Sequence, residues 1–261
     1  MSEASLFDAT PLWLLLVVTV AFILLVVEGG YRAGIFRGRR SEKEREAPID
    51  AMVGAILGLL AFMLAFTFGM ATSRDDTRKQ LVLDEAIAIR IADLRAQLLP
   101  EPHRSEIRAL LREYVDVRVE GVRDPGKLQQ AIARSEALHD TLWSRAAVLG
   151  QETSGTAFLG PFVQSLTDVI GLHAKRVSAG LHNRLSGTIW MALYSLTALA
   201  MGMMGYRAGM TARRSIIAIL ALAVAFSAVI VLIADLDRTQ EGMLKVSQQA
   251  MVDLQSKLNA E

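Results

Sequence analysis

Glu136 and His139 are the residues whose spacing comes closest to that of a metal site. Their Glu-x-x-His pattern occurs in helical bundles that bind two metal ions, but such a bundle needs a second copy of the motif and further glutamates. The chain has no second copy. We therefore favour a hydrated helix face over a metal role. His173, on an apolar stripe, is interpreted as a core residue, and His182 as an interfacial one.

Other catalytic chemistry has less support. The chain has no cysteine, which excludes disulfides, thiolate metal sites and cysteine nucleophiles. It contains no glycine-rich phosphate loop beside a strand and no nucleophile elbow. Its net charge of +1 gives no electrostatic reason to expect nucleic-acid binding. We predict a protein that is not an enzyme and that uses no metal and no other cofactor.

Acidic and basic residues are concentrated just after the second apolar segment of the chain. They are Arg74, Asp75, Asp76, Arg78, Lys79, Asp84, Glu85 and Arg90. On most helices such residues are solvated partners at i,i+4, worth about 0.2–0.5 kcal/mol per pair. If the helix lines a vestibule, the same residues set the electric field at its mouth. Both interpretations stay open.

These charges belong to the segment that organises the chain, residues 51–99. Its first part, through Ser73, is a charge-free stretch of about 23 residues, which is long enough to span a bilayer. No proline or glycine follows Gly69 within the segment, and aliphatic residues then recur at helical spacing. They are Leu83, Ile87, Ile91, Leu94 and Leu98. The pattern predicts one long helix, half in lipid and half in water.

Apolar blocks predict four membrane spans in total. They lie at about residues 12–29, 51–72, 185–206 and 215–234. With 52% hydrophobic residues segregated from the charged ones, the composition is typical of a membrane protein. The fold class is therefore an all-α membrane protein with four transmembrane helices.

The predicted organisation has a first transmembrane hairpin (1–73), an extramembrane helical bundle (74–184) and a second hairpin (185–235). We expect the last helix of this insert to continue through Leu185 into the third span. An amphipathic helix is predicted to continue from Asp235 to about Leu258, in a C-terminal segment over 236–261.

The pentapeptide GYRAG occurs twice, and each copy ends an odd-numbered span and precedes a basic connector. This shared context favours a parallel duplication of one hairpin over a chance match. We interpret the copies as interfacial turns, in which glycine frees the backbone, tyrosine anchors at the interface and arginine meets lipid phosphate. The residues concerned are Gly30, Tyr31, Arg32, Gly34, Gly205, Tyr206, Arg207 and Gly209.

The distribution of lysine and arginine predicts the orientation in the membrane. The two hairpin connectors hold six and three of these residues, and the tail before Leu12 holds none. Because short basic loops stay in the cytoplasm, we place both connectors there. The termini and the insert are then periplasmic, in a multi-pass protein of the bacterial inner membrane.

Small residues gather on one face of the second span. They are Gly54, Gly58, Ala61, Ala65 and Gly69. Such a strip lets helices approach closely in lipid, within one subunit or between subunits. Phe62 and Phe66 lie one turn apart on the neighbouring face. They either contact lipid or form rings around a symmetry axis, where an apolar constriction gates by dewetting. The span interiors carry no charge, which disfavours a coupled transporter.

Three segments of the chain resemble a bacterial membrane family known as bestrophin-like. They are LLAFMLAFTFGMATSRDDTRKQLVLDEA, LRAQLLPEP and LDRTQEGMLKVSQQ. Bestrophins are pentameric ion channels whose second span lines the pore and carries an apolar neck. The resemblance implies a homo-oligomer, pentameric, that conducts inorganic ions such as chloride across lipid. It places Phe62 and Phe66 in the constriction, and these residues at its mouth: Arg74, Asp75, Asp76, Arg78 and Lys79.

A second hypothesis comes from a different class of protein. The long helices would then belong to a non-conducting membrane scaffold or sensor, and the amphipathic helices of the insert would form a bundle that docks a partner.

Overall fold

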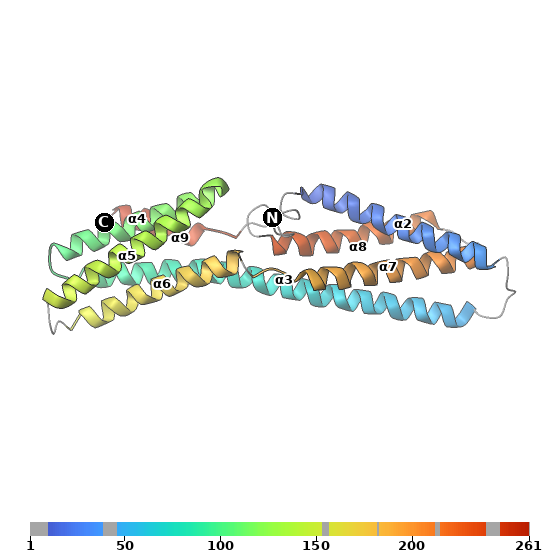
Figure 1. The fold of residues 1–261 in the computed structure, drawn as a ribbon, viewed down its shortest axis with the longest axis horizontal. Helices are drawn as coiled ribbons and strands as arrows, with labels where there is room; N and C mark the ends of the chain where they lie inside the picture. The colour runs from blue at the N-terminus through green and yellow to red at the C-terminus, as the bar shows by residue number, and fades with distance from the viewer. Residues whose placement is uncertain are drawn as a thin grey trace. The chain divides into compact units, whose positions relative to one another are not determined.

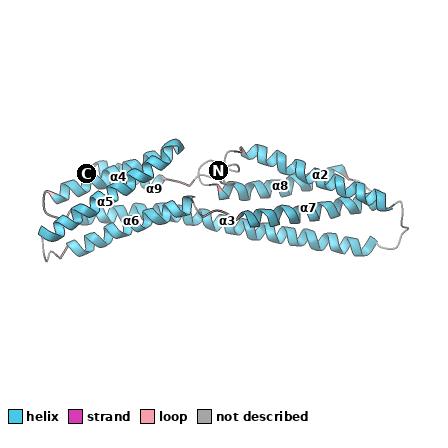
Figure 2. Ribbon diagram, viewed as in Figure 1, coloured by secondary structure: helices cyan, strands magenta, loops and turns pink. Residues whose placement is uncertain are grey.

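The computed structural model describes residues 10–38, 46–152, 157–181, 183–211, 215–238 and 246–260. Within these ranges all regular structure is helical (Figure 1, Figure 2), which confirms the predicted all-α class. The elements are α2 (Leu12–Gly38), α3 (Glu46–Ala96), α4 (His103–Arg123), the 3-10 turn η1 (Pro125–Lys127), α5 (Leu128–Glu152), α6 (Leu159–Leu181), α7 (Gly187–Met210), α8 (Ile216–Asp237) and α9 (Gln249–Ala260).

Four of these helices, α2, α3, α7 and α8, are long and apolar enough to cross a membrane. The predicted long helix is confirmed as α3, an uninterrupted helix of 51 residues. At 1.5 Å per residue it is about 77 Å long, more than twice the roughly 30 Å of a bilayer's hydrocarbon core. Only part of α3 can therefore lie in lipid.

The chain folds as two compact units. The membrane unit comprises Met1–Ser73 with Arg184–Leu244, and the polar unit comprises Arg74–Asn183 with Lys245–Glu261. Helix α3 contributes residues to both. The C-terminal helix α9 belongs to the polar unit, because Met251, Leu254 and Leu258 are buried in that unit's core.

The core of the membrane unit contains apolar side chains from α2, α3, α7 and α8. Its buried members include Ile23, Leu60, Leu64, Leu193, Ala200, Ala223 and Ile230. Few polar groups interrupt it. The hydroxyls of Thr19 on α2 and Tyr194 on α7 lie 3.1 Å apart and satisfy each other, as polar groups in lipid must.

Both copies of GYRAG lie inside helices, so their interpretation as turns is wrong. The first copy lies in α2 and the second in α7. A Cβ placed on Gly30 would overlap the carbonyl oxygen of Gly202, and one on Gly205 would overlap that of Val27. The contacts are reciprocal, and residue numbers on the two helices rise together, as in a parallel pair. The repeated Gly-x-x-x-Gly spacing thus lets two backbones approach closely.

The arginines of the two copies have carboxylate partners, and their contact with lipid phosphate stays a prediction. The Nε of Arg32 donates to Glu28 at 2.9 Å, and Arg207 donates from Nη2 to Asp50 at 2.7 Å. Both guanidinium groups therefore have carboxylate partners within the membrane unit.

Replacing Gly30 with alanine is expected to destabilise the membrane unit by about 1–3 kcal/mol, the usual cost of overpacking. The added methyl group would meet the backbone of α7, which cannot move aside as a side chain can. Gly29→Ala is the matched control, because a Cβ on Gly29 meets nothing within 4 Å. Thermal unfolding of the full chain in detergent micelles measures both. Equal melting temperatures for the two variants would contradict the contact.

The prediction that the last helix of the insert continues into the third span is wrong. Helix α6 ends at Leu181, and α7 begins at Gly187. Ser186 is extended and its side-chain oxygen accepts a hydrogen bond from the Thr188 N–H, which is a typical helix N-cap. The Leu185 N–H donates to Asp237 Oδ1 at 2.8 Å. Serine therefore starts a new helix where the apolar pattern alone indicated continuity.

The predicted helix from Asp235 to about Leu258 is also interrupted. Helix α8 ends at Asp237, and Arg238 is extended with φ −76° and ψ 136°. Its guanidinium donates to the Thr10 carbonyl oxygen at 2.7 Å. Residues 239–245 lie outside the described residues, and α9 begins at Gln249.

Candidate functional site

The part of α3 in the membrane unit has one covered and one uncovered side. Leu60, Leu64 and Ala71 are buried on the covered side. Phe62 and Phe66, the predicted constriction residues, are 65% and 59% exposed. Large apolar side chains that their own unit leaves mostly uncovered are suited to lipid or to another copy of the chain.

The strip of small residues lies on the same uncovered side. All five members are exposed: Gly54, Gly58, Ala61, Ala65 and Gly69. A Cβ on any of the three glycines would meet nothing within 4 Å. The strip therefore packs against no helix of its own unit, in contrast to the glycines of the two GYRAG copies. The strip of small residues and the phenylalanine pair can therefore both contact lipid or another copy of the chain.

The residues predicted at the pore mouth differ in their exposure. Asp75 and Arg78 are buried, with Arg78 Nη2 lying 3.7 Å from Asp75 Oδ1. Lys79 is exposed, and its Nζ lies 2.6 Å from Asp75 Oδ2. Asp76 is exposed and Arg74 is half-buried. Asp76 and Lys79 are therefore the members of the set that solvent reaches most freely.

In the polar unit, the aliphatic stripe of α3 is exposed. Its members on α3 are 40% to 49% exposed: Leu83, Ile87, Ile91 and Leu94. Leu98, in the turn after α3 ends, is 57% exposed. The buried face of α3 is instead rich in alanine and includes Ala86, Ile89, Ala92 and Ala96. Small side chains allow the neighbouring helices to approach α3 closely, so the larger aliphatic residues lie outside the core.

A groove of about 390 Å³ borders this stripe. Ile87, Ile91 and Leu172 supply apolar surface, and Asp84, Asp168 and Lys175 supply charge. It is open to solvent and combines an apolar floor with ionic groups. These properties suit a helix surface better than a small, enclosed ligand.

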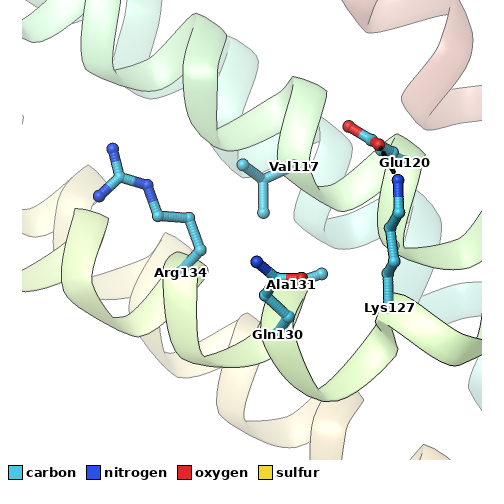
Figure 3. A pocket seen from close by; sticks show the side chains of 7 residues that line it. Val117, Glu120, Lys127, Gln130, Ala131 and Arg134 are labelled. Carbon is cyan, nitrogen blue, oxygen red and sulfur yellow. Dashed lines mark hydrogen bonds and ion pairs between the residues drawn. The ribbon is translucent and has the colours of Figure 1, made fainter.

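A second hollow lies between α4 and α5 (Figure 3). Two cations line it, and each has a carboxylate partner. Lys127 Nζ lies 2.9 Å from Glu120, and Arg134 Nε lies 3.0 Å from Glu113. With both charges neutralised, the hollow offers little to attract an anion.

The polar unit encloses a buried cluster of ionisable groups, which we call the Glu85 cluster. It consists of Glu85 on α3, Tyr114 and Arg118 on α4, His139 on α5, and His173 and Arg176 on α6. Glu85 is fully buried and lies at its centre. It accepts hydrogen bonds from Tyr114 Oη at 2.5 Å, from Arg118 Nη2 at 3.3 Å and from Arg176 Nη1 at 2.5 Å.

The aromatic members of the cluster lie close together, with the His139 and His173 rings edge to face. The His139 ring centroid lies 4.8 Å from that of Tyr114 and 4.9 Å from that of His173. Burial raises the pKa of Tyr114, and the Glu85 carboxylate adds to this, so the phenol keeps its proton and donates it. Burial, the His173 ring and the Arg118 guanidinium lower the pKa of His139 to about 4.

The sequence interpretation missed this cluster. It grouped Glu85 with charges that are either solvated partners or line a vestibule, and both interpretations are wrong for Glu85, because its side chain is fully buried. It also assigned His139 to a hydrated face, although His139 is 5% exposed. His173, interpreted as a core residue, is buried and lies 3.1 Å from the Tyr114 hydroxyl. Among the described residues, no group of three His, Asp or Glu could hold a metal ion. His182 lies outside the described residues.

The matches to known proteins are to a bestrophin-like domain and to membrane protein structures. A family model described as a bestrophin-like domain matches residues 11–251, and no curated protein matches the chain. Two crystal structures, each described as that of a membrane protein, are similar in fold. One gives a TM-score of 0.66 at 13% identity, covering 95% of this chain and 97% of the other. The second gives 0.64 at 14% identity, covering 93% and 95%.

Proposed function

The chain belongs to the bestrophin-like family, and we propose on this basis that it forms a homo-oligomeric ion channel. In this channel each copy contributes α3 to the wall of a shared pathway through the membrane. The resemblance to bestrophins leads us to propose five copies and an anion, chloride, as the permeating ion.

The observation that carries this proposal is the uncovered side of α3 in the membrane unit. Phe62 and Phe66 lie there together with the strip of small residues. Small residues permit close approach of helices from neighbouring copies. Bulky phenyl groups beside them would narrow the space that the copies enclose. An apolar constriction of this kind blocks ions when it loses water and passes them when it is wet.

Charge at the end of the membrane segment gives the proposed pathway its mouth. Arg74, Asp75, Asp76, Arg78 and Lys79 follow the charge-free stretch directly. Asp76 and Lys79 are exposed, so they are the ones we propose to set the field that ions meet. Buried Asp75 orients Lys79 through their 2.6 Å ion pair.

The basic connectors determine the orientation that we propose. Both hairpin connectors lie in the cytoplasm of a bacterial cell under the positive-inside rule. The polar unit and both termini then lie on the periplasmic side. Bestrophins keep their helical insert in the cytosol, so a protease-protection assay on intact cells would establish whether this family differs.

A cysteine at Ala65 is expected to form disulfide-linked dimers in native membranes. The wild-type chain has no cysteine, so only the introduced thiol can react. If α3 of one copy faces α3 of another, Ala65→Cys gives a dimer band under mild oxidation. Leu25→Cys is the control, because Leu25 is 72% exposed but lies on α2. Equal dimer yields at both positions would argue against an assembly built on α3.

The aliphatic stripe of the polar unit favours a second candidate function, a non-conducting scaffold that docks a partner. Five exposed aliphatic side chains beside a groove could bind another protein as well as another copy. Assembly distinguishes the two candidates: a channel needs several copies around one pathway, whereas a scaffold can act as a monomer.

A further inference from the structure

The charges around His139 are unbalanced in the positive direction. Its ring lies against Tyr114 on α4 and His173 on α6, and the charges of Glu85 on α3 and Arg118 on α4 act on it. Arg176 on α6 joins the cluster through Glu85. One carboxylate therefore faces two guanidinium groups. Arg176 also donates a hydrogen bond to the neutral side chain of Gln248. No second carboxylate among the described partners of the cluster is available to balance a further positive charge.

Hydrogen bonding fixes the proton positions of Tyr114 and His173 in the cluster. The hydroxyl of Tyr114 donates its single proton to Glu85. His173 Nδ1, 3.1 Å from the same hydroxyl, must then be the donor, and its Nε2 carries a lone pair when the ring is neutral. The Nε2 atoms of His139 and His173 are buried without a hydrogen-bond partner. Protonation of the His139 ring makes its Nε2 a buried donor without an acceptor, which disfavours the protonated ring in the closed state.

We propose that the Glu85 cluster is an acid-sensitive lock, in which protonation of His139 separates α5 from α4 and α6 and opens the polar unit. The closed state holds His139 neutral between the Tyr114 and His173 rings. The protonated ring adds a third cation to a cluster that already holds Arg118 and Arg176, and opening gives that cation access to water. The lock is a property of the polar unit alone. Any control of ion flow by it rests on the proposed channel function.

The direction of the pH dependence follows from the two states. In the open state His139 titrates near the ordinary value of 6.5, whereas in the closed state its pKa is about 4. Below pH 6.5 the open state therefore binds a proton that the closed state does not. Linkage then favours opening progressively as the pH falls from 6.5 to 4, with little further effect of this group below 4.

Hydrogen exchange of the full chain in lipid nanodiscs tests the lock directly. Exchange of peptides from α5 is measured between pH 7 and pH 4 and corrected for the intrinsic exchange rate at each pH. The wild type is expected to lose protection about tenfold for each pH unit below 6.5, as one linked proton requires. His139→Phe keeps the ring contacts but cannot titrate, so its protection should stay constant to about pH 4.5.

His103→Gln is the matched control, because His103 is buried but bonds Glu152 at 2.8 Å, outside the cluster. It should retain the wild-type slope in α5. A wild-type slope in His139→Phe would overturn the proposal. If that variant does not fold, a ¹³C NMR titration of the histidine rings in the wild type tests the proposal instead. One ring with a midpoint near pH 4 supports the lock, and midpoints near 6.5 for all four rings overturn it.

The test of the lock is independent of the test of the channel. Hydrogen exchange needs no ion flux, so a protein that does not conduct can still show the protection loss. Conversely, if the protein conducts ions but its α5 protection does not change with pH, the lock is contradicted and the channel is supported.

Discussion

Replacing Glu85 with alanine is expected to lower the free energy of unfolding of the polar unit by about 3–5 kcal/mol, the usual cost of breaking a buried ion pair. The substitution removes the acceptor of the Tyr114 hydroxyl and the carboxylate partner of Arg118 and Arg176. Two guanidinium groups would then be buried without a counter-charge. Because a whole domain is stable by about 5–15 kcal/mol, the loss removes a large fraction of that stability and lowers the urea concentration at which the unit unfolds.

Urea unfolding of the full chain in micelles measures this effect. Trp143 lies on α5, so its fluorescence reports on the polar unit once Trp13 and Trp190 are replaced by phenylalanine. Asp84→Ala is the matched control, because Asp84 neighbours Glu85 in sequence, is only half-buried and bonds the exposed side chain of Gln80. Its effect should stay within about 0.5 kcal/mol. Similar losses for both variants would show that the cluster contributes no special stability.

Replacing Phe62 and Phe66 together with alanine is expected to raise ion leak severalfold. If rings of these side chains close the pathway, their removal from every copy widens the constriction and admits water. Ions then cross without waiting for the apolar segment to become wet. The same change would alter little in a pair of residues that only contacts lipid.

Phe68→Ala is the matched control for this pair. Phe68 lies on the same helix and is 37% exposed, against 65% and 59% for Phe62 and Phe66. Reconstituted vesicles loaded with an ion-sensitive dye measure leak for all three proteins. An equal increase in the Phe68 variant would indicate that the leak comes from general damage to the helix and not from a constriction.

The main features of the fold were predictable because they depend on local sequence. A charge-free block followed by helical spacing, with no proline or glycine between Gly69 and Leu99, specifies one continuous helix through both units. The four spans follow from the lengths of apolar blocks in the same way. Ser186 shows the limit of that reasoning, since a single N-cap residue ends the continuity that hydrophobicity alone indicated.

The Glu85 cluster and the glycine contacts depend on partners far away in the sequence. Nothing local distinguishes Glu85 from its solvated neighbours. Glu85 can be buried because Arg118 and Arg176 pair with its carboxylate, and they lie 33 and 91 residues later in the chain. Likewise, the GYRAG sequence is compatible with a turn or with close helix packing. Only the structure shows that the two copies pack against each other, α2 against α7. The signal available was the Gly-x-x-x-Gly spacing within each copy.

The stripe from Leu83 to Leu98 illustrates a further limit. Helical periodicity shows that these residues share a face, but it does not show whether the face meets its own unit or another molecule. The alanine-rich face of α3 forms the core instead, because alanine admits close neighbours.

Ion flux through vesicles that contain the purified wild-type protein tests the central claim most directly. Chloride and potassium gradients are imposed separately, on protein shown to be folded and inserted. The account predicts flux that is larger for chloride than for potassium. Absence of flux for both ions would contradict the channel, and the aliphatic stripe of the polar unit would then be the surface on which to seek a partner.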